Sequence, residues 1–385
     1  MQKEKHLDGI RGIAAFIVVI YHYISGFYPA LYYGNINNVR TGSGVELFIA
    51  STPLNLIYDG DVSVCIFFIL SGYVLTYKFF KYNDTSAIIS AGIRRYFRLM
   101  PPVLFSVFIA YILMKLRLFY NVKASEITTS FWLGSFYNFS PNILEMFKHG
   151  IWGVLFRQSV IYNPTLWTMY YEFYGSLIVL SFVLLIGKSR NRYIVYVVAL
   201  YITIHTKFLP FIFGLILSDL YNTKLHVMDK YNTKYLNSIL LLLGLFLASY
   251  PPYMPVENTM YKFMKINFIE NVYYFYHSVG SFLIMIVILS SAKLKQIFSN
   301  KLFVFLGKIS FSMYIIHFMI LNSLSSFLFI NLVNYYKYSH AFFIVLIISL
   351  GVIISLSYYV YKYIDLNGIK LSKKIYNDFF RPLND

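Results

Sequence analysis

A succession of long apolar segments is the feature that most restricts how this chain can fold. A helix needs about 20 mainly apolar residues to cross the hydrocarbon core of a bilayer. Of the 385 residues, 58% are hydrophobic and only 13% are charged, against roughly 25% charged in an ordinary soluble domain. The sequence therefore predicts an all-α, polytopic transmembrane helix bundle of about ten helices, forming a single integral membrane domain over residues 1–385 with no soluble domain. The expected spans lie at approximately 10–28, 62–80, 101–120, 165–186, 193–207, 208–221, 236–250, 271–291, 305–333 and 339–363.

The distribution of basic residues predicts the orientation of this bundle. The net charge of +17 sits in short clusters between the apolar segments. That pattern fits topology and contact with anionic lipid better than binding of nucleic acid. Because Lys and Arg are enriched in cytoplasmic connections, both termini are expected in the cytoplasm, although Lys115, Arg117 and Lys123 would then lie outside.

Two further features limit the chemistry. The single cysteine, Cys65, lies within an apolar segment, so no intrachain disulfide can form and no metal is expected. The connections at about 29–61 and 121–164 are long and contain aromatic residues and glycines. Long ordered connections on one face usually shape a site there, and both are expected on the outside.

Arg11 and His22 are the first candidate site residues. They are eleven residues apart, which is close to three full turns, so they face the same side of one helix. Over that distance the helix rises by about 16 Å, which places His22 well inside the bilayer and Arg11 near its inner boundary. Ionisable side chains at such depth normally face a protein interior or a water-filled cavity. A buried His bonded to a neighbouring helix, with Arg11 as a topological anchor, explains the spacing equally well.

Glu172 is a second ionisable residue within a span. It lies seven residues after Thr165, in a helix expected to run inwards from Pro164. Its depth is expected to match that of His22, where the carboxylate would fix the tautomer of the imidazole and stabilise its protonated form. An unrelated hydrogen bond within or between helices is the alternative.

A basic cluster precedes the third span. Arg95 and Arg98 share one helix face, Arg94 is adjacent, and Lys78 and Lys81 come shortly before. Guanidinium groups bind phosphates bidentately, so this cluster suits the nucleotide end of coenzyme A. Topology alone also places basic residues between two spans.

Small and polar residues within the spans are the remaining candidates. Ser71 and Gly72 lie mid-span, where they allow close helix packing or leave room for a narrow ligand. His317 is another histidine within a span and is expected to support the site or to lie in the core.

Together these segments resemble the membrane acyltransferase family 3. The resemblance rests on five motifs in the family's order, at 7–22 (LDGIRGIAAFIVVIYH), 64–75 (VCIFFILSGYVL), 94–102 (RRYFRLMPP), 166–174 (LWTMYYEFY) and 309–317 (ISFSMYIIH). Many members carry Asp where this chain has Cys65, and some carry a fused extracytoplasmic domain that is not found here. A thiol in apolar surroundings is poorly ionised, so Cys65 is not expected to be a nucleophile.

The resemblance implies an acyl-CoA-dependent O-acyltransferase, most often an O-acetyltransferase, in the bacterial cytoplasmic (inner) membrane. Acetyl-CoA would enter from the cytoplasm, and the acceptor would be an extracytoplasmic glycan or lipid-linked glycan such as O-antigen, capsule or exopolysaccharide. The other expected partner is membrane lipid; nucleic acid is not expected, and a homo-oligomer is compatible with the sequence. The family's roles fall on Arg11 and His22 as essential residues, on Arg95 and Arg98 as donor-binding residues, and on Glu172 as the intramembrane acid.

These expectations combine into one mechanism. Arg11 and the basic cluster would hold the phosphates of coenzyme A, and the pantetheine arm would pass Ser71 and Gly72 to bring the thioester to His22. His22 would then act as a general base, or as the acyl acceptor in an acyl-histidine variant. The residues expected to support the site are Trp167, Tyr314 and His317.

Two other classes of protein fit part of the pattern. A flippase or exporter of lipid-linked sugars would also be polytopic, but it would be expected to pair its buried charges along a continuous pathway. A non-catalytic scaffold of an envelope complex would tolerate His22→Ala.

Overall fold

A computed structural model describes residues 4–224, 232–257, 259–266 and 269–380. These residues form helices, turns and irregular segments, and they include no β-strand. Lys3, Lys230 and Arg381, which contributed to the predicted orientation, lie outside the described residues.

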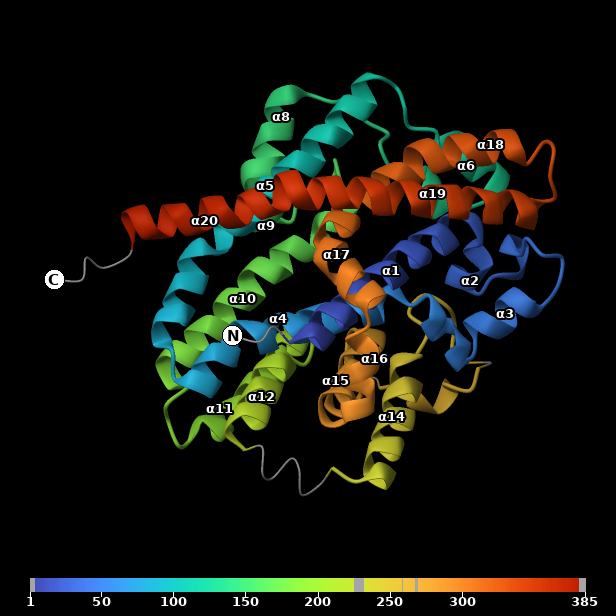
Figure 1. The fold of residues 1–385 in the computed structure, drawn as a ribbon. Coiled ribbons are helices and arrows are strands. Elements are labelled where there is room, and N and C mark those ends of the chain that lie inside the picture. Colours follow the sequence, from blue (N-terminus) through green and yellow to red (C-terminus); the bar gives the residue numbers. More distant parts are fainter. Residues whose placement is uncertain (1–3, 225–231, 258, 267–268, 381–385) are drawn as a thin grey trace.

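Ten helical segments correspond one to one to the ten predicted spans. The last two consist of consecutive helices joined by one π-helical turn, as α17–η6–α18 and α19–η7–α20. The segments are α1 (Lys5–Phe27), α4 (Gly60–Tyr82), α5 (Thr85–Lys115), α10 (Trp167–Ile186), α11 (Arg192–Thr203), α12 (Leu209–Thr223), α14 (Lys234–Ala248), α15 (Val272–Ser290), α17 (Lys301–Ile320) with η6 (Leu321–Ser325) and α18 (Ser326–Leu332), and α19 (Tyr338–Val360) with η7 (Tyr361–Asp365) and α20 (Leu366–Phe379) (Figure 1).

Seven of these segments are long and apolar enough to cross a membrane, as judged over the described part of the chain. Helices α11, α12 and α14 are shorter. The all-α transmembrane bundle expected from the sequence is therefore confirmed, and the protein is a multi-pass membrane protein.

The predicted boundaries are wrong at two helices. Helix α5 begins at Thr85, sixteen residues before the expected start of that span, because the Asp84 side chain accepts a hydrogen bond from the Ala87 backbone N–H at 2.9 Å and caps the helix there. The helix then continues through Pro101 and Pro102. The last span continues beyond residue 363 through η7 into α20, which packs along α5.

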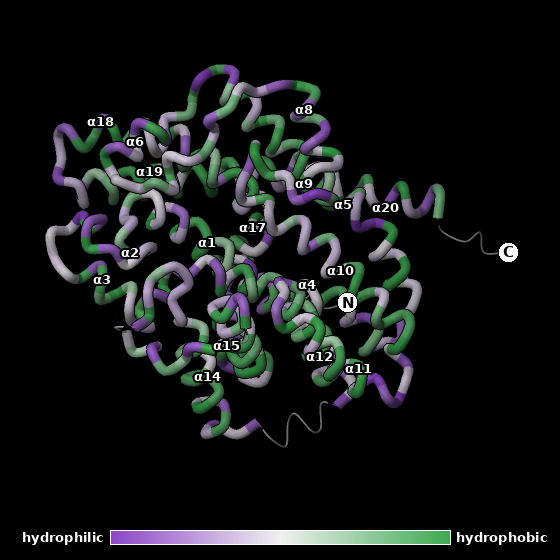
Figure 2. The backbone as a smooth tube through the Cα atoms, turned by 180° about the vertical axis from the view of Figure 1, so that it is seen from behind, coloured by the Kyte–Doolittle hydropathy of each residue, from purple (hydrophilic) through white to green (hydrophobic). Residues whose placement is uncertain are grey.

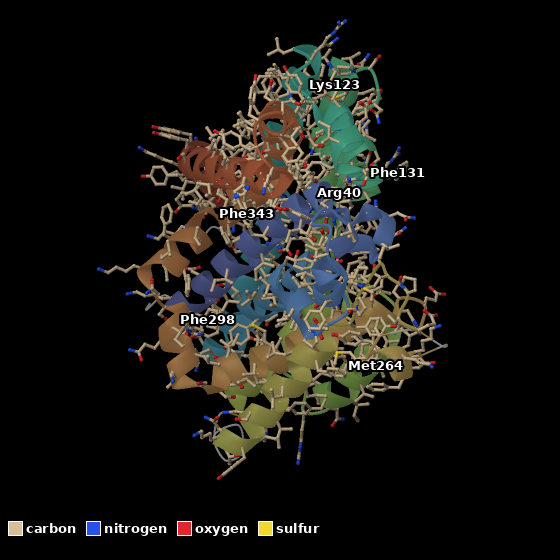
Figure 3. All side chains as sticks on the ribbon, turned by 90° about the vertical axis from the view of Figure 1, so that its right-hand side faces the viewer. Arg40, Lys123, Phe131, Met264, Phe298 and Phe343 are labelled. Carbon is tan, nitrogen blue, oxygen red and sulfur yellow. The ribbon has the colours of Figure 1, made fainter. Side chains whose placement is uncertain are left out.

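The surface of the bundle is apolar. Hydrophobic residues follow most of the helices, and hydrophilic residues concentrate at helix ends and connections (Figure 2). Large apolar side chains project outwards, among them Phe343, which is 57% exposed on α19 (Figure 3). An outward-facing apolar surface of this kind is suited to lipid.

The two long predicted connections are ordered and fold into short helices. The first holds α2 (Pro29–Tyr33) and α3 (Val45–Ala50), seen on the right of Figure 1. The second holds α6 (Asn121–Thr128), α7 (Phe131–Gly134), α8 (Ile143–Lys148) and α9 (Val154–Arg157). A further short helix, α16 (Ala292–Phe298), precedes α17.

Backbone contact between α1 and α17 sets the register at the centre of the bundle. A Cβ atom on Gly307 would lie 1.9 Å from the Asp8 carbonyl oxygen, and one on Gly12 would lie 2.5 Å from the Gly307 nitrogen. Residues further along α1 contact residues further along α17, so the two helices run parallel. His22 and His317 each lie ten residues after one of these glycines, and parallel helices with a common rise bring them to the same level.

Candidate active site

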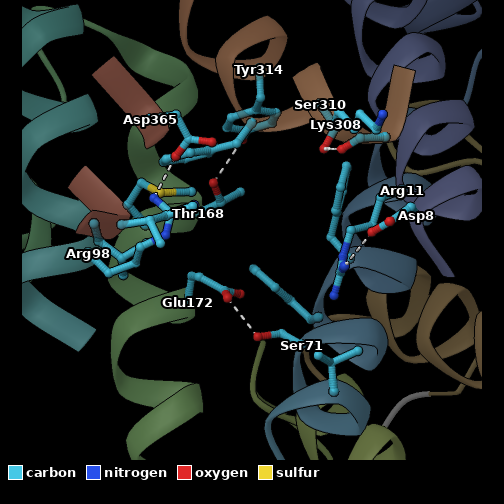
Figure 4. A pocket seen from close by; sticks show the side chains of 18 of the residues that line it. Asp8, Arg11, Ser71, Arg98, Thr168, Glu172, Lys308, Ser310, Tyr314 and Asp365 are labelled. Carbon is cyan, nitrogen blue, oxygen red and sulfur yellow. Dashed lines mark hydrogen bonds and ion pairs between the residues drawn. The ribbon is translucent and has the colours of Figure 1, made fainter. Parts of the chain in front are cut away.

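One cavity of about 460 Å³ opens among the helices near the beginning of α1. We name it the arginine cavity after Arg11, Arg95 and Arg98, which all line it; Arg11 and Arg98 are labelled in Figure 4. Its walls come from α1, α4, α5, α10 and α17 and from the segment that joins α19 to α20. The structure thus brings together three of the basic residues singled out in the sequence.

Each of these arginines has a carboxylate partner. Arg11 donates a hydrogen bond to Asp8 at 3.5 Å. Nη1 of Arg98 lies 2.6 Å from Oδ1 of Asp365, in an ion pair visible at the upper left of Figure 4. Asp365 is on the π-helical turn η7, and such turns are frequent at functional sites.

The third pair is Arg95 with Glu172, and it corrects a prediction. Glu172 accepts hydrogen bonds from Arg95 and, at 2.6 Å, from the Ser71 hydroxyl. Arg95 is further held by Ser176, whose hydroxyl oxygen accepts from Nε at 2.7 Å. The expected pairing of Glu172 with His22 is not present. The carboxylate of Glu172 is paired with the Arg95 guanidinium instead, because a cationic partner offsets the cost of burying a negative charge.

Other predicted donor-binding residues point elsewhere. The Arg94 side chain donates to the Ser90 carbonyl of its own helix at 3.0 Å, and neither Arg94 nor Lys78 lines the arginine cavity. Gly72 faces α12, where a Cβ atom would lie 2.3 Å from the Phe211 carbonyl oxygen. Its role is therefore helix packing, while its neighbour Ser71 lines the cavity.

A second cavity, of about 330 Å³, contains His22. We name it the histidine cavity. Both long connections contribute to its walls, as expected from the sequence, through Tyr32 from the first and Trp132 and Gln158 from the second. The ring of Trp132 stacks on that of His22, with the ring centres 5.6 Å apart.

His22 and His317 are direct neighbours. Nδ1 of His22 lies 2.8 Å from the Val18 carbonyl oxygen and 3.1 Å from Nε2 of His317. Nδ1 of His317 lies 3.0 Å from the Met313 carbonyl oxygen. Because a carbonyl oxygen only accepts, both rings carry their proton on Nδ1, and Nε2 of His22 is left with a lone pair. This arrangement leaves a basic nitrogen on a ring that lines the histidine cavity.

Charged residues that the sequence did not single out also line the histidine cavity. Lys207 lies with its Nζ 3.8 Å from the centre of the Trp167 ring, a cation–π contact, and both residues line the cavity with Asp61. Asp8 and Asp365 were likewise missed in the arginine cavity. Their sequence signal is weak, since Asp8 stands at the start of the first span and Asp365 lies beyond the expected end of the last.

The two cavities share part of their lining. Four helices line both of them, each at successive depths. Along α4 the lining passes from Asp61 in the histidine cavity to Ser71 in the arginine cavity, and along α10 it passes from Trp167 to Glu172. Val64 and Tyr314 line both cavities and therefore lie between them.

Comparison with known proteins gives a consistent result. The acyltransferase family 3 model, described as an acyltransferase domain, matches residues 4–359. The chain is 24% identical to the acyltransferase clz18 of Cochliobolus lunatus, over 69% of this chain and 68% of that protein. It is 23% identical to the O-acetyltransferase PaAT-1 of Phomopsis amygdali, over 97% and 85%, and 23% identical to the acyltransferase R4 of a Phoma species, over 81% of each. No solved structure matches the chain.

Proposed function

Because the chain belongs to acyltransferase family 3, we propose that this membrane acyltransferase moves an acetyl group from acetyl-CoA in the arginine cavity to a hydroxyl group of a glycan in the histidine cavity. The observation that carries the proposal is that the two cavities share Val64 and Tyr314 in their linings, and that His22 lines the second cavity. A donor and an acceptor that enter from opposite ends would meet there.

The arginine cavity has the charge expected of a donor site. Arg11, Arg95, Arg98 and Lys308 line it together with the three carboxylates of Asp8, Glu172 and Asp365. The lining thus keeps one excess positive charge, and the guanidinium groups suit the phosphates of coenzyme A. Acetyl-CoA would supply the activated thioester, and the flexible pantetheine arm would extend past Ser71 towards Tyr314.

The chemical step follows from the tautomer of His22. Nε2 of His22 takes the proton of the acceptor hydroxyl as the oxygen attacks the thioester carbonyl. Collapse of the tetrahedral intermediate breaks the carbon–sulfur bond and leaves an ester, and the proton on His22 passes to the departing thiolate. His317 acts as a positioning residue, because its Nε2 accepts from Nδ1–H of His22 and stabilises the imidazolium that forms. Lys207 supplies positive charge near the developing oxyanion.

The walls of the histidine cavity suit a sugar. Aromatic rings offer flat apolar surfaces to the C–H faces of a pyranose, and the polar groups of Asp61 and Gln158 can hydrogen-bond hydroxyls. The aromatic residues in the lining are Tyr21, Tyr32, Trp132, Phe136, Trp167, Tyr253, Tyr314 and Phe318.

The bias of basic residues supports placing the donor side in the cytoplasm. The three relatives named above are fungal, so a bacterial cytoplasmic membrane remains a prediction of the sequence.

The test is transfer of labelled acetyl from acetyl-CoA in membranes that contain the protein. His22→Ala should abolish incorporation of label into membrane-associated glycan while the protein level stays normal. His340→Ala is the matched control, because His340 is exposed at the start of α19. Movement of sugar across the membrane without covalent change would support a carrier and overturn the proposal. Full activity of His22→Ala would exclude His22 as the base.

A further inference from the structure

Two side chains from different helices line both cavities. Val64 comes from α4 and Tyr314 from α17, and each is only 6% exposed. Every other residue that lines one cavity is absent from the lining of the other. These two side chains therefore mark the place where the linings of the arginine cavity and the histidine cavity come together.

The Tyr314 side chain is fixed in place. Its hydroxyl donates to the Thr165 carbonyl oxygen at 2.7 Å and accepts from the Thr168 hydroxyl at 2.9 Å; the second bond is drawn in Figure 4. Thr168 lies in the first turn of α10, and Thr165 lies in the 3₁₀ turn Pro164–Leu166 that precedes it. Asn163, directly before this turn, donates to the Ile315 carbonyl oxygen of α17 at 2.8 Å. Swinging the ring aside would break two buried hydrogen bonds, and each unsatisfied buried group carries a desolvation penalty.

Val64 lines the same two cavities with a short, branched side chain. A β-branched residue in a helix has one strongly preferred χ1 rotamer, so Val64 also cannot swing aside freely. The positions of both side chains are thus restrained, so the space that they leave depends on their size.

We propose that Val64 and Tyr314 form a neck that selects the donor by the width of its acyl group. The inference rests on the proposed function, in which the acyl group leads the pantetheine arm from one cavity into the other. An unbranched acyl group is no wider than the methylene chain that follows it, and it passes wherever that chain passes. An acyl group branched next to the carbonyl, or one with an aromatic ring, is wider and is rejected.

Two isomeric donors separate the effect of the width of the acyl group from the effect of its composition. Butyryl-CoA and isobutyryl-CoA contain the same atoms and differ only in the branch next to the carbonyl. The measured quantity is the ratio of kcat/KM for isobutyryl-CoA to that for butyryl-CoA, with labelled acyl transfer to the native acceptor in membranes. Val64→Ala removes two methyl groups from the neck and should raise this ratio at least about tenfold, the scale of discrimination that a single methylene provides in a fitted pocket.

The matched control is Val62→Ala on the same helix. Val62 has the same exposure, 6%, and lines neither cavity. It should leave the ratio unchanged. The reciprocal variant Val64→Ile narrows the neck and should lower the ratio, which keeps the test decisive if Val64→Ala reduces the amount of folded protein.

The outcomes separate the two proposals. Normal acetyl transfer by every variant, with the same ratio as in the wild type, would overturn the neck and leave the acyltransferase function intact. An equal rise in Val62→Ala would overturn it as well, since the effect would then be general loosening of α4. Absence of transfer from any acyl-CoA by the wild-type protein would overturn the proposed function, and the neck with it.

Discussion

The close contact between α1 and α17 makes Gly307→Ala the most informative single change. The added Cβ atom would lie 1.9 Å from the Asp8 carbonyl oxygen and 2.5 Å from the carbonyl carbon, whereas ordinary contact begins at 3.4 Å. The obstructing atoms belong to a helix backbone and cannot rotate away. The two helices must therefore separate locally by about 1.5 Å, the difference between 1.9 and 3.4 Å.

We expect this separation of α1 and α17 to extend to His22 and His317, which lie ten residues further along the two helices. His22 and His317 are 3.1 Å apart, so a shift of this size takes the pair beyond the range of a hydrogen bond. Overpacking of this kind typically costs about 1–3 kcal/mol of stability. Misplacement of a catalytic group by about 1 Å can lower the rate by about 100-fold, and a loss of that size is the expected effect on kcat.

The assay is transfer of labelled acetyl, normalised to the amount of folded protein from a thermal unfolding curve. Gly351→Ala on α19 is the matched control, because no atom lies within 4 Å of the added Cβ atom; it should keep normal activity. If Gly307→Ala is folded and retains more than about one third of the wild-type rate, then the glycine contact does not set the geometry of the site, and the 100-fold estimate is wrong.

Two further changes test the individual residues. His317→Ala should lower kcat without changing the KM for acetyl-CoA, and His317→Gln should restore part of the rate because its amide oxygen can accept the Nδ1–H of His22; a raised KM in both variants would instead indicate a general loss of structure. Arg98→Lys should raise the KM for acetyl-CoA more than it lowers kcat, because a lysine cannot bind a phosphate bidentately, and unchanged donor affinity in a binding measurement would contradict the donor assignment of the arginine cavity.

The helices were predictable because hydropathy is a local property of the sequence. The length and the composition of each apolar segment can be read directly from the sequence. All ten predicted spans correspond to helical segments. The ends were less predictable where polar residues continue a helix beyond its apolar part. Thr85 and Phe379 are examples, since the first follows a capping aspartate and the second ends an amphipathic segment.

The site was predictable in composition but not in pairing. Arg11 and Arg95, both singled out in the sequence, line the arginine cavity, and His22 lines the histidine cavity. Depth along a helix cannot reveal which neighbour a side chain meets, so Glu172 was assigned to the wrong partner. The contact of His22 with His317 depends on the register of two helices almost 300 residues apart in sequence. The equal spacing of Gly12 from His22 and of Gly307 from His317 was the available signal, and it becomes readable only once α1 and α17 are known to be adjacent.

The ion pair between Arg98 and Asp365 has a thermodynamic consequence for the end of the chain. Asp365 directly precedes α20, and that helix packs along α5, which carries Arg98. An anion drawn to Arg98 competes with Asp365 for the same guanidinium, so occupancy of the cavity and docking of α20 are linked. Such linkage is reciprocal: whatever loosens α20 favours the anion, and the anion loosens α20 by the same free energy. The docking of α20 against α5 therefore depends on whether an anion is bound at Arg98.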